Sequence, residues 1–202
     1  MPTSLTFTKK DILNSLILGD HGGIIYTTQS LKGFRGRKVT SLIGGGALNG
    51  SSTAHTPPAS IQWRKRLIDI NGQVMHVDSL KRRSRGWFSS ARLWQWGAMS
   101  YELHFSSGEW TARSSDGNTV ATFFPYQRRV FHKSEQAQIF LLRDLSPTET
   151  AFLIVVFIYM ELSRQDKQAR NTSITQPISS AAANAGAASA AAGGGGGGGG
   201  GC

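Results

Sequence analysis

Residues 146–167 read SPTETAFLIVVFIYMELSRQDK, and every side chain from Ala151 to Met160 is apolar. Ser146 is a favoured N-cap residue, a proline follows at the first helical position, and Glu149 stands three residues after the cap. This combination of a capping box and an N-terminal proline is typical of a helix start. The pattern predicts a helix over about residues 147–167.

The predicted helix is apolar on every face, so protein or lipid must enclose it. Glu149 and Glu161 bracket 11 uncharged residues. At 1.5 Å per residue these cover about 16 Å, whereas the hydrocarbon core of a bilayer is about 30 Å thick. We therefore expect a helix inside a protein core. A tail-anchored segment, as in a scramblase-like membrane protein, is the alternative.

The chain before this helix alternates apolar and polar side chains, as strands with one buried face do. Residues 99–105, MSYELHF, show the alternation most clearly. Turn signals separate the runs, above all Asn71-Gly72, a dipeptide that favours tight hairpins. Closely spaced strands with tight turns predict an antiparallel meander. Because the strands must also enclose the helix, and closure removes exposed edges, we predict a mainly β fold, an antiparallel closed β-barrel wrapped around the C-terminal helix.

The chain has 202 residues, which allows one modest domain. We expect this domain over residues 1–170, with a flexible Gly- and Pro-containing loop over about 44–58. Residues 171–202 are rich in Ala and Gly and end in nine glycines and Cys202, so we expect a disordered tail. A single terminal Cys excludes a disulfide framework and suits a reducing compartment. No apolar segment follows a basic start, so we expect no secretory signal and a cytoplasmic protein.

Both ends of the expected domain carry a recognisable pattern. Its residues are Leu5–Phe7, Asp11–Leu16, Tyr26–Thr28, Phe152–Glu161 and Arg164–Lys167. In these segments the chain resembles a fungal family of unknown function in the Tubby C-terminal-like superfamily, over roughly residues 3 to 168. The resemblance implies a β-barrel around a central hydrophobic helix, as in phospholipid scramblases and plant LURP-one-related proteins. Tubby proteins bind phosphoinositides through basic residues outside the barrel, but no such motif aligns residue by residue with this chain.

Motifs of catalysis and cofactor binding do not occur in the sequence. The five histidines stand singly, without HExxH or another ligand spacing, and no Gly-rich segment ends in G-K-[ST]. No serine lies in a G-x-S-x-G elbow, and the one cysteine lies in the expected tail. We therefore expect a protein that is not an enzyme and that needs no metal or cofactor.

The basic clusters are the feature of the sequence that indicates a function. All of the net charge of +10 lies in the first hundred residues, which hold 14 Lys and Arg against 4 Asp and Glu. Large aromatic residues are interleaved with the clusters. The candidate residues for binding an anionic ligand are Arg64, Lys65, Arg66, Lys81, Arg82, Arg83 and Arg85.

Two kinds of partner suit this mixture. An anionic membrane surface, with phosphoinositide as the lipid, attracts the cations and accommodates tryptophan at the headgroup level. Nucleic acid offers phosphates to the cations and bases for stacking, and the run from Lys81 to Arg85 also matches a nuclear import signal. In the third interpretation the tryptophans are core and the charges cap solvated strand ends. Convergence of the clusters on one face would favour binding.

Overall fold

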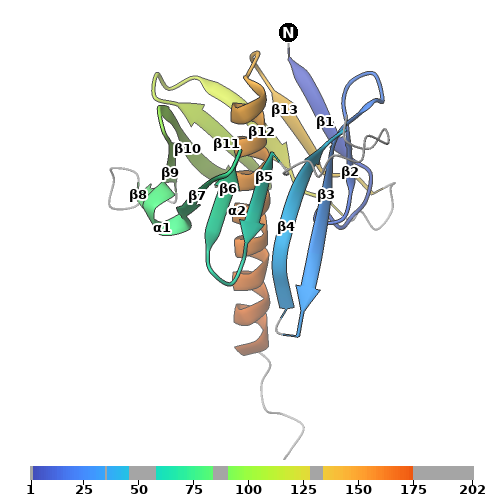
Figure 1. The fold of residues 1–202 in the computed structure, drawn as a ribbon, viewed down its shortest axis with the longest axis vertical. Coiled ribbons are helices and arrows are strands. Elements are labelled where there is room, and N and C mark those ends of the chain that lie inside the picture. The colour runs from blue at the N-terminus through green and yellow to red at the C-terminus, as the bar shows by residue number, and fades with distance from the viewer. Residues whose placement is uncertain (1, 35, 46–57, 84–90, 128–133, 175–202) are drawn as a thin grey trace, which may run out of the picture. The chain divides into compact units, whose positions relative to one another are not determined.

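The structure, a computed structural model, describes residues 2–34, 36–45, 58–83, 91–127 and 134–174 (Figure 1). The chain divides into two compact units, residues 1–163 and 164–202. The first unit holds every strand described, together with the buried part of the C-terminal helix. The second unit contains the last turns of that helix.

The described part of the chain forms one antiparallel sheet of 13 strands, with a short helix and a long one (Figure 1). The strand order is β7-β6-β5-β4-β3-β2-β1-β13-β12-β11-β10-β9-β8, so two meanders meet where β1 pairs with β13. The elements are β1 (Thr3–Phe7), β2 (Leu16–Leu18), β3 (Ile24–Gly33), β4 (Gly36–Gly44), β5 (Ala59–Gln62), β6 (Leu67–Ile70), β7 (Gln73–His76), α1 (Val77–Leu80), β8 (Lys81–Arg83), β9 (Arg92–Trp96), β10 (Met99–Ser106), β11 (Glu109–Ser114), β12 (Thr119–Phe124), β13 (Gln138–Leu141) and α2 (Pro147–Ile174).

The meander prediction is confirmed, and its best turn signal lies where expected. Asn71 and Gly72 connect β6 to β7 with φ angles of 51° and 82°. Two consecutive left-handed residues are what a two-residue hairpin turn requires, and Asn-Gly adopts them at little cost. The predicted strand at residues 99–105 is β10, with Tyr101 and Leu103 on the buried face.

The prediction of a closed barrel is wrong for the part of the chain that the structure describes. The sheet has two edges, β7 and β8, which are joined by α1 in place of a ladder of backbone hydrogen bonds. His76 Nδ1 accepts a hydrogen bond from the Asp78 amide at the start of α1, at 3.2 Å. Val77 and Leu80 of α1 are fully buried. Side chains of α1 therefore pack between the two edge strands. The alternation of apolar and polar residues in the strands does not predict this helix.

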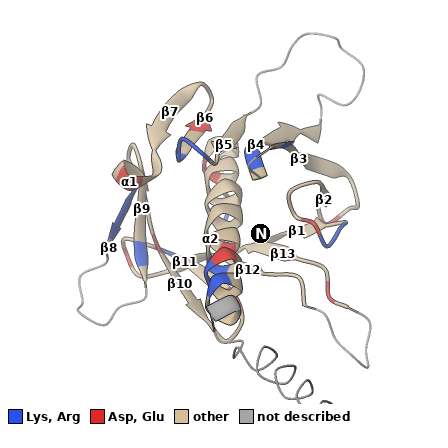
Figure 2. Cartoon of the chain, turned by 90° about the horizontal axis from the view of Figure 1, so that it is seen from below, with Lys and Arg blue, Asp and Glu red and all other residues tan. Residues whose placement is uncertain are grey.

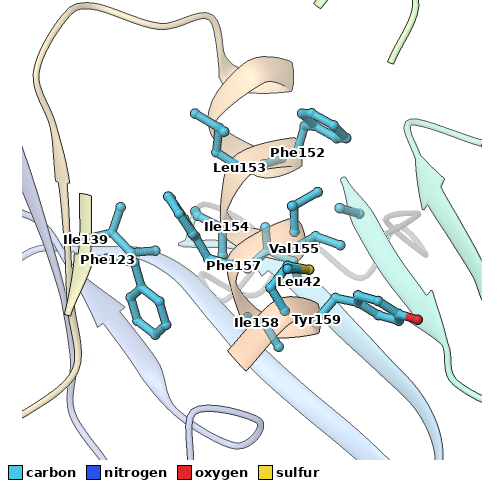
Figure 3. Packing of buried hydrophobic residues seen from close by; sticks show 14 of the residues in the cluster. Leu42, Phe123, Ile139, Phe152, Leu153, Ile154, Val155, Phe157, Ile158 and Tyr159 are labelled. Atoms are coloured by element: carbon cyan, nitrogen blue, oxygen red, sulfur yellow. The ribbon is translucent and has the colours of Figure 1, made fainter. Parts of the chain in front are cut away.

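α2 lies within the curve of the sheet, with strands on both sides of it (Figure 2). All residues from Ala151 to Leu162 are buried, which confirms a helix enclosed by protein. Phe157 packs against Phe123 of β12 with ring centroids 5.6 Å apart, and on another side Phe152 packs against Trp96 of β9 at 6.0 Å. Figure 3 shows Phe123 and Ile139 of the sheet beside Phe157 of the helix.

The start of α2 is as predicted, but its end is not. The Ser146 hydroxyl accepts the Glu149 amide at 3.2 Å, so Ser146 caps the helix. The helix runs to Ile174, seven residues beyond the predicted end, and it takes in the first residues of the segment expected to be disordered. The residues after Leu162 are mostly polar, and they continue the helix although they offer no apolar face for packing. Residues 175–202 of the expected tail lie outside the described residues, as do residues 46–57 of the expected loop.

Among the described residues, no helix combines the length and the hydropathy that crossing a bilayer requires.

Candidate anionic-ligand surface

Basic residues from three segments of the sequence lie at neighbouring positions in the structure. The Trp63 amide donates to the Lys38 carbonyl at 3.1 Å, which ties the turn after β5 to the start of β4. The Val77 amide donates to the Arg66 carbonyl at 2.8 Å, which ties the same turn to α1. Figure 2 shows basic segments at the start of β4, beside β6 and along β8. We call this set the basic rim: Arg37, Lys38, Arg64, Lys65, Arg66, Lys81 and Arg82.

The turn between β5 and β6 presents the central part of the rim. The Arg66 amide donates to the Trp63 carbonyl at 3.3 Å, and Arg66 adopts a left-handed φ of 55°. This tight turn leaves Arg64, Lys65 and Arg66 exposed. A turn without apolar side chains at its tip places three consecutive cations in solvent.

A shift of register in the β3–β4 hairpin turns Arg37 toward the rim. Leu31 opposes Val39, but Lys32 opposes Arg37, so β4 has one extra residue at this point. Such an irregularity redirects side chains. The Arg37 Cζ atom lies 5.0 Å from the ring centroid of Trp63. Arg37 therefore joins the rim through a cation–π contact.

Aromatic rings form a layer beneath the rim. Trp63 stacks on Tyr159 of α2 with centroids 5.7 Å apart and an interplanar angle of 10°, and Trp94 meets the same tyrosine edge-on at 5.6 Å. The Lys81 Nζ atom lies 5.9 Å from the Trp94 centroid. Tyr159 thus links the helix to the β5–β6 turn and to β9, and the rim lies over these packed aromatic rings.

The interleaved tryptophans belong to the core, as the third interpretation held. Trp94 is fully buried, and Trp96 and Trp110 are each 5% exposed. Trp63 is partly buried against the core and donates its indole N–H to Thr40 at 2.8 Å. Trp87 lies outside the described residues. The rings of Trp63, Trp94, Trp96 and Trp110 therefore pack against the core, and the cations are the groups that face solvent.

The electrostatics of the rim are almost uniformly positive. No Asp or Glu occurs between Asp20 and Asp69 in the sequence, so β3, β4 and β5 carry no carboxylate. Asp78 pairs with Arg66 at 2.6 Å, in the open, with both side chains more than half exposed. A hydrogen bond with Tyr159, and also the charge of Asp78, raise the pKa of Arg66 above its ordinary value despite some desolvation. Arg66 therefore keeps its charge at physiological pH.

Five of the seven residues proposed from the sequence fall in the rim. Arg64, Lys65 and Arg66 adjoin α1, and Lys81 and Arg82 follow directly from it. Arg83 ends β8, where its backbone pairs with that of Arg92. Arg85 lies outside the described residues. The structure thus places parts of both predicted clusters in the rim, but not Arg83.

Sequence reasoning missed Phe34 as a candidate residue. Its side chain is fully exposed, at 104% of the reference area, in the turn between β3 and β4. A bulky aromatic side chain between two glycines, Gly33 and Gly36, next to cations was the available signal. The alternation of apolar and polar residues indicates strands, but it does not indicate how exposed a residue in the turn of a hairpin is.

A polar cluster lies at the start of α2, away from the rim. Glu149 accepts hydrogen bonds from the Tyr101 hydroxyl and from Arg143, the latter at 2.9 Å. Burial, and then the hydrogen bond with Glu149, raise the pKa of Tyr101. Within the described ranges, no three His, Cys, Asp or Glu side chains gather in a way that could hold a metal ion.

Comparison with known proteins adds one structural likeness. No model of a known protein family matches the chain, and no curated protein matches it either. An Arabidopsis thaliana protein of known X-ray structure superposes with a TM-score of 0.45 and 10% identity, over 81% of this chain and 91% of that protein. We draw nothing on function from a likeness at this level.

Proposed function

We propose that this protein is a non-catalytic binding module of Tubby-like fold that attaches to anionic lipid headgroups, phosphoinositides included, through the basic rim. The observation that supports this function most directly is the convergence of the rim. Two backbone hydrogen bonds continue the β4–β5 and β6–β7 pairing and so join the start of β4, the β5–β6 turn and α1. The cations on these three segments therefore form one local concentration of positive charge. The Tubby-like assignment rests on the enclosed C-terminal helix and on the motifs at the two ends of the domain.

The charges available to a membrane can be counted from the structure. Lys38, Arg64, Lys65 and Arg82 are the exposed cations of the rim that have no carboxylate contact in the described residues. Each cation at an anionic surface contributes about 1 kcal/mol, so the four together supply about 4 kcal/mol. That corresponds to a dissociation constant of about 1 mM, so the rim by itself gives weak, reversible attachment.

Flotation of the full chain with vesicles tests this function. Phosphatidylcholine vesicles are compared with vesicles that also contain phosphatidylserine or a phosphoinositide, at low and at high salt. We expect flotation only with the anionic vesicles, and we expect salt to weaken it because surface charges are screened. A preference for phosphoinositide over phosphatidylserine at equal charge would identify headgroup recognition.

A matched pair of variants separates the rim from net charge. The double variant Arg64→Gln/Lys65→Gln removes two charges from the rim, and Arg113→Glu lowers the net charge equally at an exposed position in β11. We expect the first to weaken vesicle binding about 30-fold, from about 1 kcal/mol per charge, and the second to have little effect. Equal losses in both variants would contradict a localised surface. If the parent binds nucleic acid and no vesicle, the alternative function replaces this one.

A further inference from the structure

The tip of the β3–β4 hairpin exposes the largest apolar side chains on the charged part of the surface. Phe34 is fully exposed, and Leu31 is 59% exposed. Lys32 and Lys38 flank them and are exposed as well. Gly36 takes a left-handed φ of 95°, which lets the chain reverse tightly around the phenylalanine. The tip thus presents an aromatic ring between cations.

This tip stands clear of the neighbouring strands. On one side, β2 pairs with β3 only as far as Thr27, and on the other side β5 pairs with β4 only from Val39 to Leu42. The two strands of the hairpin continue to pair with each other until Gly33 opposes Gly36. Figure 1 shows the hairpin reaching beyond the β5–β6 turn. Among the strands that the structure describes, no third strand pairs with the end of the hairpin that carries Phe34.

The composition of the tip fits the interface of an anionic bilayer. Aromatic side chains settle at the headgroup level, and lysine stems lie along apolar surface while their charges stay in water. No carboxylate between Asp20 and Asp69 opposes an anionic surface here. The Trp63–Lys38 hydrogen bond joins the base of the hairpin to the β5–β6 turn, so the hairpin adjoins the rim.

We propose that the hairpin tip inserts the Phe34 ring into the headgroup region of an anionic membrane while the basic rim lies on the surface. This inference rests on the proposed function and supplies what that function needs. Charge alone gives weak attachment, and stable attachment of a peripheral protein takes two signals. Withdrawing a fully exposed phenylalanine from water strengthens binding by about tenfold or more.

Site-specific fluorescence tests the insertion in the full chain. Phe34→Cys is made in a Cys202→Ser background and labelled with an environment-sensitive dye, and Leu142→Cys serves as the matched control. Leu142 is also an exposed apolar residue, at 48%, and it follows β13. With phosphatidylserine vesicles we expect a blue shift at position 34 that spin-labelled lipids quench. The label at position 142 is expected to stay in water.

Binding by unlabelled variants gives a second readout. We expect Phe34→Ala to reduce flotation about tenfold, Phe34→Trp to retain it, and Leu142→Ala to leave it unchanged. All three changes are at exposed positions, so loss of the fold does not confuse the result.

The outcomes separate this inference from the function on which it rests. If the parent floats and the rim variant does not, while the label at position 34 stays in water, insertion is refuted and attachment by charge stands. If the parent does not float with any vesicle, both proposals fall. A blue shift without vesicles that grows with protein concentration would mean that the tip docks on a second copy of the chain, which also refutes insertion.

Discussion

Replacing Val155 by Asp places a carboxylate inside the sheet, where the native side chain is 2% exposed. The loss of the buried valine costs about 2 kcal/mol. The new side chain can stay inside only in its protonated form, because an unpaired charge is expelled from an apolar core. Protonating an acid of ordinary pKa about 3.9 at pH 7 costs about 4 kcal/mol. The sum, on the order of 6 kcal/mol, is comparable with the whole stability of a domain, which is about 5–15 kcal/mol.

The pH dependence of this variant distinguishes burial from a general loss of packing. Burial raises the pKa of the introduced Asp in the folded state, so stability is highest below its ordinary pKa of about 3.9 and falls as the pH rises. At pH 4.5 protonation costs only about 1 kcal/mol, and the total penalty shrinks to about 3 kcal/mol. Val155→Asn has a similar shape without a titrating group, so its penalty is expected not to change between these two pH values.

Urea unfolding, followed by circular dichroism at both pH values, gives the free energies of unfolding. Thr172→Asp introduces the same side chain at an exposed position of α2 and serves as the control. We expect Val155→Asp to be largely unfolded or strongly destabilised at pH 7 and the control to unfold like the parent. Coincident unfolding curves for the two Asp variants at pH 7 would refute the enclosure of α2.

Two further substitutions test buried polar contacts. Tyr101→Phe removes the hydroxyl that donates to Glu149 and should cost about 1–2 kcal/mol at pH 7. Because the folded state raises the pKa of Tyr101, its contribution is present below about pH 10 and is lost above it. The parent should therefore lose stability more steeply than the variant in an alkaline urea series; parallel slopes would contradict this. Trp110→Phe removes the indole donor that lies 2.9 Å from the buried Glu161 carboxylate and should lower the free energy of unfolding by about 1–3 kcal/mol. Thermal unfolding should show a smaller loss of stability for Trp63→Phe than for Trp110→Phe, because the hydrogen bond of Trp63 is only partly buried. Equal losses in the two variants would contradict the expected cost of leaving the buried Glu161 carboxylate without its donor.

Local sequence patterns predicted the parts of the fold that local chemistry controls. Ser146 and Asn71-Gly72 act through backbone groups within a few residues of themselves, so the helix start and the β6–β7 hairpin lie where they were expected. The end of α2 was missed because polar residues after Leu162 extend the helix without an apolar pattern. The register shift opposite Lys32 was missed because it depends on the partner strand.

Some features of the candidate surface are likewise visible in the sequence, and others require the structure. The clusters at Arg64–Arg66 and Lys81–Arg82 are visible as runs of charge, and the uneven charge of the chain is a property of composition. Their proximity depends on the β6–β7 hairpin, which the Val77–Arg66 hydrogen bond extends, and on the helical turn of α1 that leads into β8. The exposure of Phe34 depends on where β2 and β5 stop pairing, which no pattern within the hairpin records.

By itself the sequence determined that alternating strands surround one wholly apolar helix, because side-chain periodicity and caps act over a few residues. Only the tertiary structure decided that the sheet stays open between β7 and β8, with α1 filling the gap. It also decided that Trp63, Trp94 and Trp96 pack against the core while Arg64, Lys65 and Arg66 remain at the surface. The physical reason is that strand pairing and the cost of burying a charge depend on contacts between segments that are distant in sequence. Such contacts exist only in the folded chain.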